Sequence, residues 1–141
     1  MVCRDYPDSP LLGVSVLVRR GSDVLLVKRG RAPLAGQWSL PGGLVELGER
    51  LAEAAAREVR EETGVTIADI ASLGFEEIIE RDEAGQPRSH FVLAVFSARH
   101  AGGEPEAADD AANAAWVSPD NPDALPLTAG TARVLAAENA P

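Results

Sequence analysis

Short aliphatic runs separated by turn residues dominate the hydrophobic pattern and predict several β-strands. Residues 11–19 and 23–28, LLGVSVLVR and DVLLVK, lie on either side of the turn sequence RRGS and predict a pair of antiparallel strands. The clearest strand is residues 90–100, HFVLAVFSARH, which is apolar enough to be buried on both faces. Further strands are predicted at residues 37–43 (ending in a glycine turn), 65–82 (with a bulge or bend at Gly74) and 115–118.

Two segments have helical rather than strand character. From Glu49 to Thr63 the apolar residues recur at helical spacing, and Gly64 stands where helices commonly end. Residues 127–140 predict a second helix with Thr128 as its N-cap. Strands before, between and after these helices predict a single α/β domain in which the helices pack on a sheet.

Composition and charge narrow the class of protein. The 141 residues suffice for one domain with a real core, residues 11–141, after a flexible lead-in of residues 1–10. The net charge of −9 argues against a nucleic-acid binder, because phosphate backbones need a basic surface. No apolar run reaches the length of a membrane span, and the single Cys3 can form no internal disulfide. We therefore expect a cytoplasmic protein with a small-molecule partner, either a monomer or a homodimer.

The first predicted helix carries an unusual group of like charges. On a helical wheel Glu58, Glu61 and Glu62 share an arc of about 100°. The adjoining arc, which we expect to be buried, holds Leu51, Ala52, Ala55, Ala56 and Val59. Like charges four residues apart destabilise a helix slightly, and the helix dipole disfavours anions near the C-terminus. Two locally unfavourable features at the same place are typical of a functional site.

A divalent cation would explain the three carboxylates. Mg²⁺ and Mn²⁺ prefer several oxygen ligands, and clustered glutamates supply both the oxygens and the compensating charge. The alternative is an ordinary solvated helix face, of the kind that Glu53 and Arg57 illustrate as an i,i+4 ion pair expected on the outer side. The wheel position of the three glutamates beside the core favours the cation site.

The spacing around this helix resembles the signature of the Nudix hydrolase family. Gly43 is followed after five residues by Glu49, and after seven more by residues 57–65, REVREETGV, so that every defined position of the family pattern is met. A chance match in a chain of this length has a probability on the order of one in ten million. The likeness runs from about Gly13 to Leu135. Four further segments resemble small bacterial members described as ADP-ribose pyrophosphatase-like: LLVKRG, GQWSLPGG, IIERDEAGQPRSHFVL and AAWVSPDNPDALPLT.

This resemblance implies a fold, an activity and a metal. The fold is a Nudix-type α/β/α sandwich with a mixed central sheet. The activity is hydrolysis of the pyrophosphate bond of a nucleoside diphosphate linked to another moiety, with Mg²⁺ as cofactor and Mn²⁺ as a substitute. Carried over by position, Glu58 and Glu62 are direct metal ligands, Glu61 is a direct or water-mediated ligand, and the Gly42 carbonyl is a backbone ligand.

The remaining positions of the family pattern have supporting roles by the same resemblance. Arg57 would hold the glutamates in orientation, and Glu49 would brace the entry from the loop into the helix. Gly43 would form a turn that needs the absence of a side chain. The general base is either Glu58 or an acid in the loop after the main strands, for which the candidates are Glu104, Glu106, Asp109 and Asp110.

The substrate-binding residues and the substrate itself stay open. Arg29 ends the second strand, where it would contact a phosphate or simply be solvated, and Trp38 would cover an adenine or a ribose or belong to the core. ADP-ribose or a related compound is the expected substrate, although residues 78–82 lack the proline of one ADP-ribose signature. The alternatives are a nucleoside triphosphate pyrophosphatase that sanitises the nucleotide pool and a non-catalytic Nudix-fold module that senses a ligand.

Overall fold

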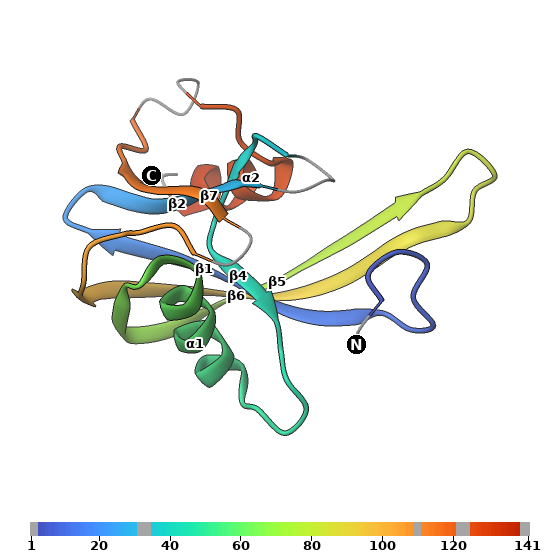
Figure 1. The fold of residues 1–141 in the computed structure, drawn as a ribbon, viewed down its shortest axis with the longest axis horizontal. Coiled ribbons are helices and arrows are strands. Elements are labelled where there is room, and N and C mark those ends of the chain that lie inside the picture. Colours follow the sequence, from blue (N-terminus) through green and yellow to red (C-terminus); the bar gives the residue numbers. More distant parts are fainter. Residues whose placement is uncertain (1–2, 31–34, 109–110, 121–124, 139–141) are drawn as a thin grey trace.

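A computed structural model describes residues 3–30, 35–108, 111–120 and 125–138 of the chain (Figure 1). Its helices are α1 (Leu51–Thr63) and α2 (Ala129–Glu138). Its strands are β1 (Leu11–Arg20), β2 (Asp23–Arg29), β3 (Trp38–Ser39), β4 (Gly42–Leu44), β5 (Thr66–Arg81), β6 (Pro87–Gly102) and β7 (Ala111–Val117). None of the helices in this part of the chain is long and apolar enough to cross a membrane.

The strands form one mixed sheet. Its main path is β3-β2-β1-β6-β5, with β4 added to β1 and β7 added to β2. Among the pairs formed by these named strands, β1 and β6 run parallel and the others are antiparallel. Because β1 pairs with strands from both halves of the chain, it brings β4 and the start of α1 against the centre of the sheet.

The two faces of the sheet carry separate hydrophobic clusters. Along β1, Val14, Val16 and Val18 point into a cluster shared with α1, whereas Leu17 points into a cluster that contains Leu135 of α2. This alternation follows from the period of two residues in a strand. The helices therefore cover opposite faces, and the predicted α/β/α sandwich with a mixed central sheet is confirmed.

Several predicted strands match the structure, and two need correction. The pair formed by residues 11–19 and 23–28 is confirmed, and so is the irregularity at Gly74, where the register of β5 shifts. The segment 37–43 is not one strand ending in a glycine turn, because its glycines lie inside β4 and pair with β1. The last strand begins at Ala111, four residues earlier than predicted.

Helix α1 begins two residues later than predicted and ends as expected. Gly64 adopts the left-handed conformation with φ of 77°, and its N–H donates to the Arg60 carbonyl. The prediction for its buried face was partly wrong, since Ala52 is exposed and Ala54 is fully buried. On the wheel Ala54 lies about 40° from Glu58, on the side of Glu61, so the buried face overlaps the acidic arc. Glu58 consequently lies at the edge of the buried face of α1 and is half-buried.

The described part of the lead-in, residues 3–10, contains no helix or strand but is fastened to the hairpin of β5 and β6. Figure 1 shows this hairpin reaching away from the rest of the sheet. The Tyr6 N–H donates to the Arg88 carbonyl at 2.7 Å, and the Tyr6 hydroxyl donates to the Asp82 carboxylate at 2.8 Å. This second bond raises the pKa of Tyr6 and lowers the pKa of Asp82.

Candidate active site

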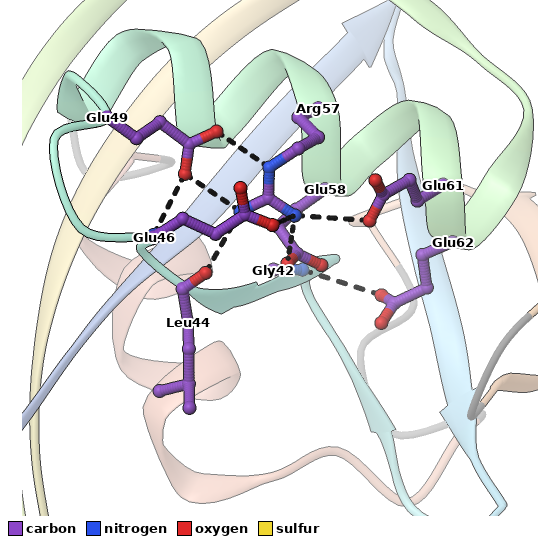
Figure 2. Close-up of polar contacts among 8 residues, drawn as sticks. All are labelled: Gly42, Leu44, Glu46, Glu49, Arg57, Glu58, Glu61 and Glu62. Carbon is purple, nitrogen blue, oxygen red and sulfur yellow. Dashed lines mark hydrogen bonds and ion pairs between the residues drawn. The ribbon is translucent and has the colours of Figure 1, made fainter. Parts of the chain in front are cut away.

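The three glutamates of α1 lie beside β4, at the centre of the sheet (Figure 2). Strand β4 passes so close to the helix that a Cβ built on Gly43 would lie 2.5 Å from the carboxylate carbon of Glu58. Real Cβ atoms essentially never come this close to another atom, so any other residue at this position would displace Glu58. A side chain at position 43 is thus excluded, as predicted, but Gly43 lies in strand β4 rather than in a turn.

Arg57 stands at the centre of the acidic group, with a side chain only 15% exposed. Its Nε and Nη2 donate to the two oxygens of Glu49, at 2.6 and 2.9 Å. Its Nη1 donates to Glu58 at 2.8 Å and to Glu61 at 3.1 Å, and Nη2 also donates to the Leu44 carbonyl at 3.0 Å. A guanidinium has five N–H groups, so these five bonds use all of its donors.

This arrangement corrects the expected pair of Arg57 with Glu53 on the outer side of the helix. The guanidinium turns inward to Glu49, whose side chain is 12% exposed, and not toward the exposed Glu53. An inward arginine gains two parallel bonds to one carboxylate, which a solvated i,i+4 pair rarely provides. Arg57 therefore pairs with Glu49 of the loop before α1 and with Glu61 four residues later, rather than with Glu53 four residues earlier.

The surroundings of Glu49 strongly affect its carboxylate. The hydrogen bonds from Arg57 and, secondarily, from the N–H of Glu46 lower the pKa of Glu49 to about 2. In turn, the bond to Glu49 raises the pKa of Arg57 above its ordinary value. The ion pair between them therefore stays charged over the whole physiological range of pH.

The depressed pKa of Glu49 makes a prediction about stability and pH. A carboxyl group with a lower pKa in the folded state contributes stability above its ordinary pKa of 4.5, and this contribution disappears as the pH falls toward about 2. The difference in free energy of unfolding between the wild type and Glu49→Gln should thus be constant near neutral pH and shrink between these two values. Urea unfolding at a series of pH values measures it. A difference that stays the same down to the lower value would contradict the assignment, and Glu53→Gln on the exposed face is the matched control.

Glu62 lies one helical turn beyond Glu58 and faces the start of β4. The Gly42 N–H donates to Glu62 Oε1 at 3.4 Å, a long hydrogen bond. The carbonyls of Glu62 and Thr63 at the end of α1 accept from the N–H groups of Ala108 and Glu106, at 3.1 and 2.8 Å. These bonds satisfy carbonyls that a helix terminus leaves unpaired, which reduces the negative potential at the end of the helix that carries Glu62.

The oxygen atoms of the three glutamates are of the kind that binds Mg²⁺ or Mn²⁺, although the three side chains do not converge on one point in this structure. Glu58, Glu61 and Glu62 supply only oxygen, the ligand that both cations prefer. Within the described residues, no three His, Cys, Asp or Glu side chains are gathered so as to hold a metal ion. Figure 2 shows the reason: Glu58 and Glu61 turn to Arg57, and Glu62 turns to the Gly42 N–H.

The other candidate residues fall in different places. Trp38 is 8% exposed and packs in the hydrophobic cluster on the α2 side, so it is a core residue. Arg29 ends β2 beside a shift in the register with β7, where its N–H donates to the Gln37 carbonyl. Glu104 accepts two hydrogen bonds from Arg20 at the end of β1. Arg20 is five residues, or about 16 Å, along β1 from Ser15, the residue that pairs with Gly42. The loop acids Asp109 and Asp110 lie outside the described residues.

The sequence interpretation missed two groups around Arg57. One is the Leu44 carbonyl, because a backbone acceptor leaves no mark in the sequence. The other is Glu46, whose Oε1 lies 3.8 Å from Arg57 Nη1. The Glu46 N–H donates to the Glu49 carboxylate at 3.0 Å, and the Glu49 N–H donates to the Glu46 carbonyl at 2.9 Å. Two acids three residues apart before a helix are the signal that could have revealed this reciprocal pair.

The fold and this arrangement of residues define the class of protein. The family model described as NUDIX domain matches residues 9–137, nearly the whole chain. The chain therefore belongs to the NUDIX family, and the resemblance found in the sequence is confirmed.

Known relatives and a solved structure agree with this membership. An ADP-ribose pyrophosphatase of Methanocaldococcus jannaschii is 38% identical over 79% of this chain and 64% of its own length. A putative 8-oxo-dGTP diphosphatase 2 of Mycobacterium tuberculosis is 38% identical over 74% of this chain and 71% of its own. A crystal structure of a MutT NUDIX hydrolase from Burkholderia pseudomallei superimposes with a TM-score of 0.79 at 30% identity, covering 94% of this chain and 100% of the other. The chain thus spans less than two thirds of the first relative.

Proposed function

We propose that the protein is a divalent-metal-dependent pyrophosphohydrolase that acts on a nucleoside diphosphate linked to another moiety, with ADP-ribose or a related compound as substrate. One observation carries the proposal: three glutamates within residues 58–62 of α1 are grouped with Arg57 beside the glycine strand β4. The name of the Methanocaldococcus jannaschii relative supports ADP-ribose as the first substrate to test.

The reaction requires water to replace a bridging oxygen at phosphorus. Water adds a hydroxyl group to one phosphorus, the bond from that phosphorus to the bridging oxygen breaks, and the proton goes to the departing phosphate. A divalent cation held by Glu58, Glu61, Glu62 and the Gly42 carbonyl would supply positive charge against the phosphate oxygens and acidify a water molecule. ADP-ribose would give AMP and ribose 5-phosphate.

The protein's own side chains divide the remaining work. Arg57 binds one oxygen each of Glu58 and Glu61 through Nη1, and is itself fixed by Glu49 through two bonds. When a cation is bound, a supporting group of this kind would limit the directions in which these two glutamates can turn. For the general base we propose Glu58 or an acid in the loop after β6. Glu58 is favoured over Glu104, because the latter is bound to Arg20 far along β1.

A substrate panel tests the proposed function. The purified protein should release AMP and ribose 5-phosphate from ADP-ribose in the presence of Mg²⁺ or Mn²⁺ and show no release when a chelator removes the metal. Nucleoside diphosphate sugars, dinucleotides and oxidised nucleoside triphosphates complete the panel, with product identity determined by chromatography. Hydrolysis of none of these compounds would contradict the proposal and favour a ligand-sensing module.

One alternative activity has support of its own. The Mycobacterium tuberculosis relative is named a putative 8-oxo-dGTP diphosphatase, and the chain covers more of that protein than of the first relative. A nucleoside triphosphate pyrophosphatase would use the same group of glutamates but release pyrophosphate and a nucleoside monophosphate. Pyrophosphate as the product from an oxidised triphosphate, with no product from ADP-ribose, would therefore establish the alternative.

A further inference from the structure

The segment after β6 crosses the last turn of α1 as a strap, which we define as residues 103–108. The strap binds the helix through its backbone, since the N–H groups of Glu106 and Ala108 donate to the carbonyls of Thr63 and Glu62. At its beginning the strap lies very close to Gly64: a Cβ built on Gly103 would stand 2.6 Å from the Gly64 carbonyl oxygen. The position of the strap is therefore coupled directly to the turn that carries Glu62.

A side-chain cluster fixes the beginning of the strap. Arg20, the last residue of β1, donates from Nη1 to both oxygens of Glu104, at 3.0 and 3.2 Å. The same guanidinium lies over the ring of Trp116, with its central carbon 4.4 Å from the ring centroid. An exposed ion pair alone contributes little, but stacking on a ring restrains the arginine and adds a cation–π attraction.

Trp116 joins this cluster to the core beneath α1. The indole ring packs against the hydrophobic cluster on the α1 side of the sheet. The ring of His100 meets it edge to face, with centroids 5.3 Å apart and planes at 87°. His100 Nε2 lies 2.7 Å from the Gly103 carbonyl, and because a carbonyl only accepts, Nε2 is the donor. One end of the strap is thus attached to β1, β6 and β7, and the other end to α1.

We infer that Arg20 is a positioning residue for the metal ligand Glu62 and acts through the strap. This inference rests on the proposed function, because it takes Glu62 as a ligand. If Arg20 is removed, Glu104 and Trp116 lose their common partner and the strap loosens over the last turn of α1. The carbonyls of Glu62 and Thr63 then lose their hydrogen-bond donors for part of the time. The backbone of Glu62, from which the side chain extends, is then held less firmly. A supporting group of this kind changes metal affinity by about tenfold.

The test compares Arg20→Gln, Arg20→Lys and the control Arg133→Ala. Arg133 also binds a carboxylate, that of Glu76, but from α2 on the opposite face of the sheet. In the metal-free proteins, NMR hydrogen exchange at the amides of Glu106 and Ala108 reports the strap. Mn²⁺ alone, titrated by calorimetry, reports the ligand set.

The inference predicts a defined pattern of results. Arg20→Gln should speed exchange at both amides and weaken Mn²⁺ binding by about tenfold, with Arg20→Lys in between and Arg133→Ala unchanged. The Mn²⁺ concentration for half-maximal activity should rise by the same factor, with kcat restored at saturating Mn²⁺. This recovery separates positioning from general destabilisation, which circular dichroism monitors.

Three results would overturn the inference: unchanged amide exchange, faster exchange with unchanged Mn²⁺ affinity, or no binding of Mn²⁺ by the wild type. The second result would reduce the strap to a structural element. A wild-type protein that binds Mn²⁺ and hydrolyses none of the panel contradicts the proposed function alone, and the Mn²⁺ affinities of the variants still decide the role of Arg20.

Discussion

Glu62→Gln is expected to abolish metal-dependent hydrolysis while the protein remains folded. The amide keeps the size of the side chain and can still accept from the Gly42 N–H, but it removes the negative charge from a proposed ligand. A loss of several kcal/mol of transition-state stabilisation corresponds to about a thousandfold in kcat. Steady-state kinetics on the best compound of the substrate panel, at fixed Mg²⁺, measures this loss.

The same variant should change stability far less than activity. The repulsion from Glu58, four residues away, and the position near the C-terminus of α1 are each worth a few tenths of a kcal/mol, so the free energy of unfolding should change by less than about 1 kcal/mol. A large loss of activity with little change in stability distinguishes a functional carboxylate from a structural one. Glu53→Gln, on the exposed face of the same helix, should leave activity unchanged. Near-normal activity in Glu62→Gln would refute the assignment of Glu62 as a ligand.

Arg57→Lys should be the second most damaging substitution, although it keeps the positive charge. Lysine has three donors on one nitrogen and cannot reproduce the two parallel bonds to Glu49 together with those to Glu58, Glu61 and the Leu44 carbonyl. We expect kcat to fall by about thirtyfold, because the glutamates lose their orientation. The free energy of unfolding should fall by about 2 kcal/mol, because half-buried acceptors lose their donors. Kinetics and urea unfolding measure the two effects.

Arg60→Lys provides the matched control for this substitution. Arg60 lies on the exposed face of α1, so replacing it by lysine should change neither kcat nor the free energy of unfolding by a measurable amount. If Arg57→Lys were as active as the wild type, a general positive charge would suffice at this position. The geometry of the five hydrogen bonds would then have no functional role.

Local patterns in the sequence were enough to predict most of the elements. The strand pair around Gly21, the helix that ends at Gly64 and the bulge at Gly74 all follow from periodicity and from residues that tolerate positive φ. The prediction failed at residues 37–43, where the chain makes two very short strands. Periodicity needs several residues to show itself, and strands of two or three residues are formed by their partners rather than by their own composition.

The sequence by itself determined that Glu58, Glu61 and Glu62 share one side of a helix, because 3.6 residues per turn places them there wherever that helix goes. It also determined the family, through the spacing of the signature residues. Only the tertiary structure decided what those glutamates meet. The pairing of β4 with β1 brings Gly43 under Glu58 and the Leu44 carbonyl to Arg57, and Arg20 meets Glu104 across 84 positions of the chain. Such partners depend on how the strands order themselves in the sheet, and the burial of apolar surface across the whole domain fixes that order rather than any local pattern.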